Sequence, residues 1–215
     1  MQSHPHTNFD PFAKVRSLSG VLMVFLFARA SMRAVNYLVA KATAPSGATS
    51  MEDHQTFRMI QGGLLGVENL LSLVGMIMFL VWIYRVIKGA RAAGVMTKYS
   101  PGMAVGGWFI PIANFVLPWL TVRDGLRAVQ RPTVLAGLWW IIWIINIPLN
   151  AMFQFARQLM LVPELGDNIP FEMIESMYSM LNTMSWPYLL LDTAAWALLG
   201  VIVSIVRGAV SQRSA

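Results

Sequence analysis

Four long runs of apolar residues, at about 17–40, 59–84, 133–155 and 187–206, alternate with shorter polar stretches along the chain. A helix that crosses a bilayer needs roughly 20 mostly apolar residues, because each residue rises only about 1.5 Å. Pro187 stands where the fourth run begins. A proline loses no hydrogen bond in the first turn of a helix. The pattern therefore predicts an all-α membrane protein with four transmembrane helices.

A further apolar segment, within residues 103–130, separates the second and third predicted helices. It contains Trp108, Pro111, Asn114 and Pro118. The two prolines and the asparagine fall at i, i+3 and i+7, so in a helix they would share one face. Each proline leaves a carbonyl without its helical partner, and that carbonyl must be sheltered by protein or reach water. We therefore expect a re-entrant or an interfacial segment here.

The end of this segment has the pattern of a short amphipathic helix lying along the membrane surface. Its apolar and polar positions fall on opposite sides: Val122, Leu126 and Val129 against Arg123, Asp124, Arg127 and Gln130. Tryptophan is favoured at the level of the lipid headgroups, so Trp108 and Trp119 are expected there.

The connection between the third and fourth predicted helices contains its own helical pattern, over residues 170–184. Asn168 would cap this helix and Pro170 would fit its first turn. Four methionines recur at helical spacing: Met173, Met177, Met180 and Met184. This face would pack on the membrane, on the protein's own core or on a partner helix. Copper binding is the least favoured reading, because no histidine or cysteine accompanies the methionines.

Lysine and arginine are unevenly distributed between the predicted helices. They outnumber acidic residues in 1–16, 85–98, 123–131 and 207–215. The connection before the fourth helix is acidic instead, with Glu164, Asp167, Glu172 and Glu175. Because basic residues mark the cytoplasmic side, we expect the leader (1–16), the tail (208–215) and both ends of the 103–130 segment to be cytoplasmic.

Composition agrees with a membrane protein and excludes several kinds of site. The chain is 56% hydrophobic and 12% charged, against about 25% charged in soluble domains. Its net charge of +6 sits mostly beside the apolar runs, so it does not indicate nucleic-acid binding. Cysteine is absent, which excludes disulfides, thiolate nucleophiles and Cys-ligated metals. The histidines, His4, His6 and His54, lie outside the predicted helices, so no haem is expected within the bundle.

Charged and amide side chains inside the predicted helices are the strongest candidates for a site. They are Arg29, Arg33, Glu68, Asn69, Asn146, Asn150 and Asp192. An ionisable group within a membrane costs about 2.5–3.5 kcal/mol on insertion scales, so such groups usually face the interior and find partners.

We predict that Arg33 pairs with Asp192 and Arg29 with Glu68, while Asn69 and Asn150 occupy the remaining donors. The helical rise places all of these roughly 8–16 Å from the outer helix ends. Such a network would lock the bundle, conduct protons or ions, or contact a partner subunit or a lipid headgroup.

Several local motifs resemble a bacterial family. They are FLVWIYR at 79–85, YSPG at 99–102, WFIPIAN at 108–114 with Pro118 behind it, and the pair Trp139-Trp140. Over about 59–212 the chain resembles the bacterial domain-of-unknown-function family 4328, most specifically at 101–118. It departs from the family pattern at Lys88-Gly89, where the family has an asparagine, and near Gly107. The resemblance implies a four-helix protein of the bacterial inner membrane and implies no activity.

The sequence thus predicts a non-catalytic polytopic membrane protein, an accessory or scaffolding subunit that packs against a larger membrane complex. No HExxH, P-loop, G-x-S-x-G or GxGxxG motif is present, and no cofactor or metal is expected. The spacing Gly62-xxx-Gly66 would let a second helix approach closely. The alternative is a small transporter or channel that uses the charged cluster. A membrane-embedded enzyme with Glu68 and Asp192 as acid and base is the third.

Overall fold

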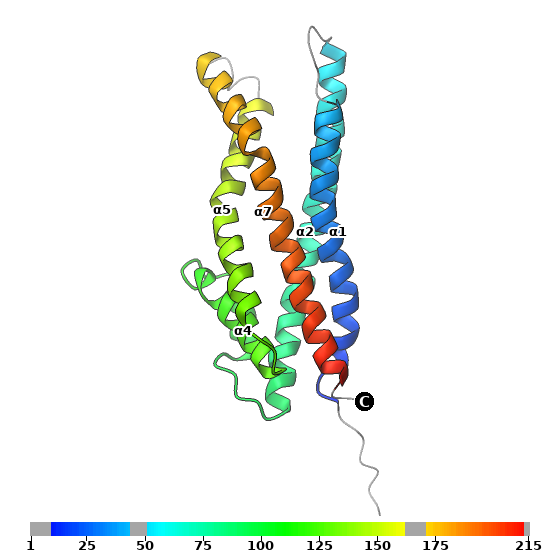
Figure 1. The fold of residues 1–215 in the computed structure, drawn as a ribbon, viewed down its shortest axis with the longest axis vertical. Helices are drawn as coiled ribbons and strands as arrows, with labels where there is room; N and C mark the ends of the chain where they lie inside the picture. The colour runs from blue at the N-terminus through cyan, green and yellow to red at the C-terminus, as the bar shows by residue number, and fades with distance from the viewer. Residues whose placement is uncertain (1–9, 44–50, 162–170, 213–215) are drawn as a thin grey trace, which may run out of the picture. The chain divides into compact units, whose positions relative to one another are not determined.

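The computed structural model describes residues 10–43, 51–161 and 171–212, and over these ranges the chain forms helices and turns without any strand. The helices are α1 (Ala13–Thr43), α2 (Met51–Ala92), α3 (Pro101–Gly106), η1 (Ala113–Phe115), α4 (Leu117–Ala128), α5 (Val134–Leu161) and α7 (Phe171–Gln212) (Figure 1).

Among the described residues, four helices are long and apolar enough to cross a membrane: α1, α2, α5 and α7. They correspond to the four predicted transmembrane helices, so the prediction of an all-α, multi-pass membrane protein is confirmed. Each helix is longer than its apolar run; α2, for example, has 42 residues. Helix propagation adds one hydrogen bond per residue, so a helix continues into polar flanks until a breaker stops it.

The boundary predicted at Pro187 is wrong. α7 is continuous over Phe171–Gln212, and Pro187 lies inside it rather than in a first turn. A proline removes one backbone hydrogen bond, and long membrane helices tolerate this where neighbouring groups satisfy the freed carbonyl. The predicted helix 170–184 is therefore the beginning of α7. Asn168, Pro170 and the side chains of the four methionines lie outside what the structure describes.

The chain forms two compact units, one made of residues 1–25, 73–137 and 200–215 and the other of residues 26–72 and 138–199. In the first unit, Trp82 of α2 is almost completely buried. Its indole Nε1 donates to Ser19 Oγ of α1 at 2.9 Å, and Ser19 in turn donates to the carbonyl of Val15 at 2.7 Å. The one polar atom of the Trp82 indole is thereby satisfied, as burial requires.

The predicted surface helix α4 packs on the protein itself. Val122, Leu126 and Val129 are buried, and a Cβ at Gly125 would stand 3.1 Å from a methyl group of Val86 on α2. Asp124, expected on the polar side, is also buried. It accepts a hydrogen bond from the backbone N–H of Lys98 at 3.1 Å, which explains why a carboxylate is tolerated there.

The residues Pro111, Asn114 and Pro118 do not share a helical face, contrary to the prediction. The helical conformation is interrupted after α3. Pro118 is buried in the first turn of α4, where a proline fits best. Pro111 is exposed in the turn between them. Trp108 is buried rather than placed as a headgroup anchor, and it packs edge-on against Phe79 with ring centroids 5.4 Å apart.

The tip of this segment presents a group of exposed apolar side chains: Phe109, Ile110, Ile112, Phe115 and Val116. An apolar tip is compatible with both a re-entrant and an interfacial position, so this choice stays a prediction.

The contact between the start of α1 and Gly89 of α2 gives the first test. A Cβ at Gly89 would stand 2.9 Å from the Phe12 ring and 2.9 Å from the backbone carbonyl of Pro11, which cannot move easily. At Gly208 of α7, a Cβ would meet no described atom within 4 Å apart from the adjoining residues and the nearby backbone of α7 itself. Relative to Gly208→Ala, we expect Gly89→Ala to lower the free energy of unfolding by about 1–3 kcal/mol, as overpacking does. Thermal unfolding in detergent measures it, and equal stabilities would contradict this packing.

Candidate functional site

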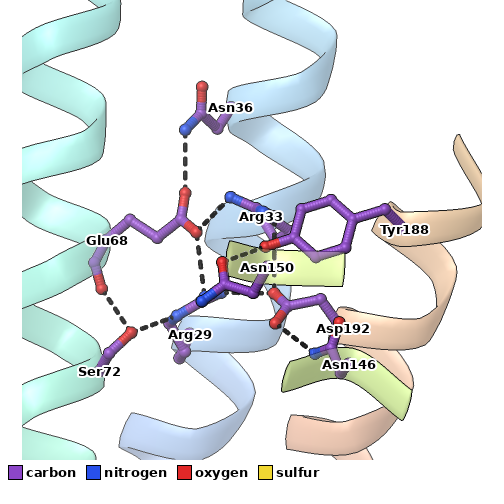
Figure 2. A network of polar contacts seen from close by, with 9 residues as sticks. All are labelled: Arg29, Arg33, Asn36, Glu68, Ser72, Asn146, Asn150, Tyr188 and Asp192. Atoms are coloured by element: carbon purple, nitrogen blue, oxygen red, sulfur yellow. Dashed lines mark hydrogen bonds and ion pairs between the residues drawn. The ribbon is translucent and has the colours of Figure 1, made fainter. Parts of the chain in front are cut away.

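Four helices each place polar side chains at the same level of the unit formed by 26–72 and 138–199. The residues come in pairs one turn apart: Arg29 and Arg33 on α1, Glu68 and Ser72 on α2, Asn146 and Asn150 on α5, and Tyr188 and Asp192 on α7 (Figure 2). Residues at i and i+4 lie above one another on one face of a helix, so both members of each pair point the same way.

Each of the two carboxylates contacts both arginines. Glu68 Oε1 lies 2.6 Å from Arg33 Nη1 and 3.0 Å from Arg29 Nη2. Asp192 Oδ2 lies 3.1 Å from Arg29 Nη1 and 3.5 Å from Arg33 Nε. The predicted pairs Arg29–Glu68 and Arg33–Asp192 are both present, but the shortest contact is Arg33–Glu68. The four charges therefore form one closed cluster rather than two separate bridges.

The cluster is buried and electrically balanced. Arg29, Arg33, Glu68 and Asp192 are each at most 6% exposed, and two positive charges oppose two negative ones. Arg29 Nη1 and Asp192 Oδ2 are close but are not aligned as a hydrogen bond, so their contact is mainly Coulombic. Burying an ion costs several kcal/mol, and mutual attraction offsets this only when the geometry is good and the remaining atoms are also bonded.

Neutral side chains bond the second oxygen of each carboxylate. Asn36 Nδ2 donates to Glu68 Oε2 at 2.9 Å, and Asn146 Nδ2 donates to Asp192 Oδ1 at 3.0 Å. Arg29 Nε donates to Ser72 Oγ at 2.5 Å, and Ser72 donates to the backbone carbonyl of Glu68 at 2.8 Å. Both acids are thus held on two sides (Figure 2).

Aromatic rings lie against both guanidinium groups. The Cζ atom of Arg29 lies 5.2 Å from the centroid of the Trp196 ring. The Cζ atom of Arg33 lies 4.4 Å from the centroid of the Tyr188 ring. A planar, weakly hydrated guanidinium can stack on a ring and bind carboxylates at its edge. This geometry explains why both cations of the cluster are arginines rather than lysines.

Two of the predicted amide roles are wrong. Asn69 is exposed, because it stands one residue, or about 100° of helix rotation, from Glu68. Asn150 does not reach an arginine; it accepts a hydrogen bond from the Tyr188 hydroxyl at 2.6 Å.

Sequence reasoning missed Asn36, Ser72 and Tyr188, although a spacing signal was present. Asn36 falls three residues after Arg33, Ser72 four after Glu68 and Tyr188 four before Asp192. Each therefore shares a helix face with a charged residue that the sequence had already singled out.

Within the described ranges, no group of three or more histidine, aspartate or glutamate side chains is placed to hold a metal ion. His4 and His6 and the side chain of His54 lie outside the described part. The two acids of the cluster are already engaged by arginine and asparagine. The cluster is therefore a set of ion pairs in which each buried charge is balanced by opposite charges.

The fold and the network define a multi-pass helical membrane protein with a buried, charge-balanced cluster. Residues 45–208 match the family described as Domain of unknown function (DUF4328), and the chain belongs to that family. The resemblance seen in the sequence is therefore confirmed. The match contains Glu68 and Asp192 and begins after α1, which supplies Arg29 and Arg33. No curated protein and no solved structure matches the chain.

The second test removes one charge from the cluster. Glu68→Gln leaves both arginines with one carboxylate, and we expect it to lower the free energy of unfolding by about 3–5 kcal/mol, as for an uncompensated buried charge. Asp10→Asn is the matched control, because the Asp10–Arg16 ion pair is partly exposed and exposed pairs contribute about 0–1 kcal/mol. Reversible unfolding in mixed micelles provides the measurement.

Adding Arg33→Gln to Glu68→Gln should recover part of the loss, with a coupling of about 0.5–3 kcal/mol. A Glu68→Gln protein as stable as the control would show that the cluster does not hold the helices together.

Proposed function

We propose that this protein is a non-catalytic accessory or scaffolding subunit, which packs against another membrane protein through the outward face of α2. The supporting observation is the small-residue surface around Gly62 and Gly66. Apart from the adjoining residues and the nearby backbone of α2 itself, no described atom lies within 4 Å of the position that a Cβ would take at either glycine. Both positions are exposed and one turn apart, so together they leave a shallow notch in the side of a spanning helix.

Asn69 adds a polar group to the same face, because it follows Gly62 by seven residues and Gly66 by three. Its side chain is exposed on a helix that is apolar enough to cross a membrane. An amide facing hydrocarbon is unfavourable unless it is hydrogen-bonded. Small residues that allow close approach, together with an amide that can bond across the contact, are what helix association in lipid uses.

The buried cluster supports a structural role rather than catalysis. Glu68 and Asp192 each contact two arginines and accept a hydrogen bond from an asparagine. Neither carboxylate can take a proton from a substrate without weakening an ion pair. A cluster of this kind suits a rigid unit that presents a constant outer surface.

Purification in mild detergent tests this proposal. Wild-type protein should elute with a larger complex at fixed stoichiometry, and Gly66→Leu should reduce the recovered complex about tenfold, which corresponds to about 1.4 kcal/mol. Ala28→Leu is the control, because it adds a similar side chain at an exposed position of α1. Recovery of the wild-type protein only as a lone monomer would overturn the proposal. So would equal losses in the two variants.

A second candidate function, a small proton or ion transporter, is favoured by one observation. Asn36 Oδ1 and Asn146 Oδ1 are buried, and neither accepts a hydrogen bond from the described residues. Each amide donates to a carboxylate of the cluster. A free acceptor therefore lies beside each acid, where a proton-bearing species could bind.

Flux measurements in proteoliposomes test the transporter. Wild-type vesicles should change their internal pH faster than empty vesicles under an imposed gradient, and Asp192→Asn should reduce the rate to that of empty vesicles because it removes a titratable group. The Asp10→Asn variant, altered at a partly exposed ion pair in the other unit, should keep the wild-type rate. If wild-type and empty vesicles behave alike, this candidate is eliminated.

A further inference from the structure

A cavity of about 730 Å³ lies in the unit formed by 1–25, 73–137 and 200–215, where the start of α1 meets the last turns of α2. Pockets that bind small molecules commonly have about 300–1,000 Å³. Three cationic side chains line it, Lys14 of α1 and Arg85 and Lys88 of α2. We call it the basic cavity.

The walls of the basic cavity are set by close packing. Phe12 is buried, and the Pro11-Phe12 segment lies so near Gly89 that a Cβ at this glycine would stand 2.9 Å from the backbone carbonyl of Pro11. Asp10 Oδ1 accepts a hydrogen bond from the Phe12 N–H at 2.9 Å and holds the start of α1 in place. Lys14 is thereby kept beside the turns of α2 that carry Arg85 and Lys88.

The positive charge of the basic cavity is not neutralised by the described residues. Asp10 is the only acidic side chain that the described residues contribute to its lining, and it already forms an ion pair with Arg16. None of Lys14, Arg85 and Lys88 forms an ion pair within the described part of the chain. Arg85 and Lys88 are three residues apart on one face of α2, where like charges repel. An anion placed between them would remove that repulsion.

The lining also has an apolar side. Leu80, Val81 and Val105 line the same cavity, and Val81 is 42% exposed. On α2, Leu80 and Val81 lie about 6–12 Å along the helix axis from Arg85 and Lys88, by the helical rise. The cations are near the end of a helix that can cross a membrane, and the apolar residues lie further into its apolar part. A ligand with an anionic head and a hydrocarbon tail matches this order.

We propose that the basic cavity binds the phosphate headgroup of an anionic phospholipid, with the acyl chains against Leu80 and Val81. Arginine presents a planar fork of donors to phosphate, while lysine binds it as a point charge. Basic pockets beside transmembrane helices are a common way of recognising such headgroups. A free phosphate would use only the cationic side of the cavity. This inference is independent of the accessory role proposed above.

The experiment measures lipid binding to the full chain purified in detergent, by native mass spectrometry with phosphatidylglycerol or phosphatidylcholine. Phosphatidylglycerol should bind at least tenfold more tightly. Arg85→Gln/Lys88→Gln should weaken its binding roughly 25-fold, at about fivefold for each cation near an anionic lipid. The matched control, Lys98→Gln/Arg127→Gln, removes the same charge from residues outside the cavity lining and should change binding less than twofold.

Three results would overturn the proposal: equal binding of the two lipids, equal losses in the two double variants, or inorganic phosphate that binds as tightly as the lipid and displaces it. The last result would assign the cavity to a free phosphate. If the cavity variant does not fold, Lys88→Gln alone serves as the test, because Lys88 is exposed. It should weaken phosphatidylglycerol binding about fivefold, and an unchanged affinity would overturn the proposal.

Discussion

The unit that contains residues 26–72 and 138–199 depends on the compensation of Glu68 and Asp192 by Arg29 and Arg33. Any one of these charges would be strongly unfavourable if it were buried alone, because removing a single ion from water costs several kcal/mol of free energy. Each becomes tolerable only when the other helices supply opposite charges and hydrogen bonds. The cluster therefore couples α1, α2, α5 and α7 within this unit, and its neutral partners Asn36, Asn146 and Ser72 are part of the same requirement.

The unit that contains residues 73–137 is held together by different means. Its core is aromatic and aliphatic around Trp82, and glycines at 89 and 125 allow the start of α1 and α4 to approach α2 closely. Close packing of this kind has little tolerance for added volume. α2 passes through both units and presents three different surfaces along its length: Glu68 toward the cluster, Gly62 and Gly66 outward, and Arg85 with Lys88 toward the basic cavity.

The spacing of residues along the sequence predicted most members of the charged cluster, but it predicted less about where helices begin and how the connecting segments fold. Charged residues in apolar helices must find each other, so Arg29, Arg33, Glu68 and Asp192 could be grouped from their positions in the sequence alone. Asn69 adjoins Glu68 in the sequence but faces another direction, whereas Asn36, three residues after Arg33, shares a helix face with it. Helix phase, which hydropathy and charge do not report, separates the two amides. Pro187 does not mark the start of a helix, because a proline in a long membrane helix need not interrupt it. The orientation across the membrane stays a prediction from the distribution of lysine and arginine.

By itself, the sequence determined the number of long apolar helices, the class of the protein and the identity of its buried charges, because these follow from hydropathy, helix length and the cost of an unpaired ion in lipid. Only the tertiary structure decided which atoms meet: that both arginines share both acids, that α4 covers α2, that Trp108 is buried and that three cations line one cavity. These outcomes depend on helix rotation and on the path of the chain after α3. A difference of one residue turns a side chain by about 100°, and periodicity does not specify which neighbour it then faces.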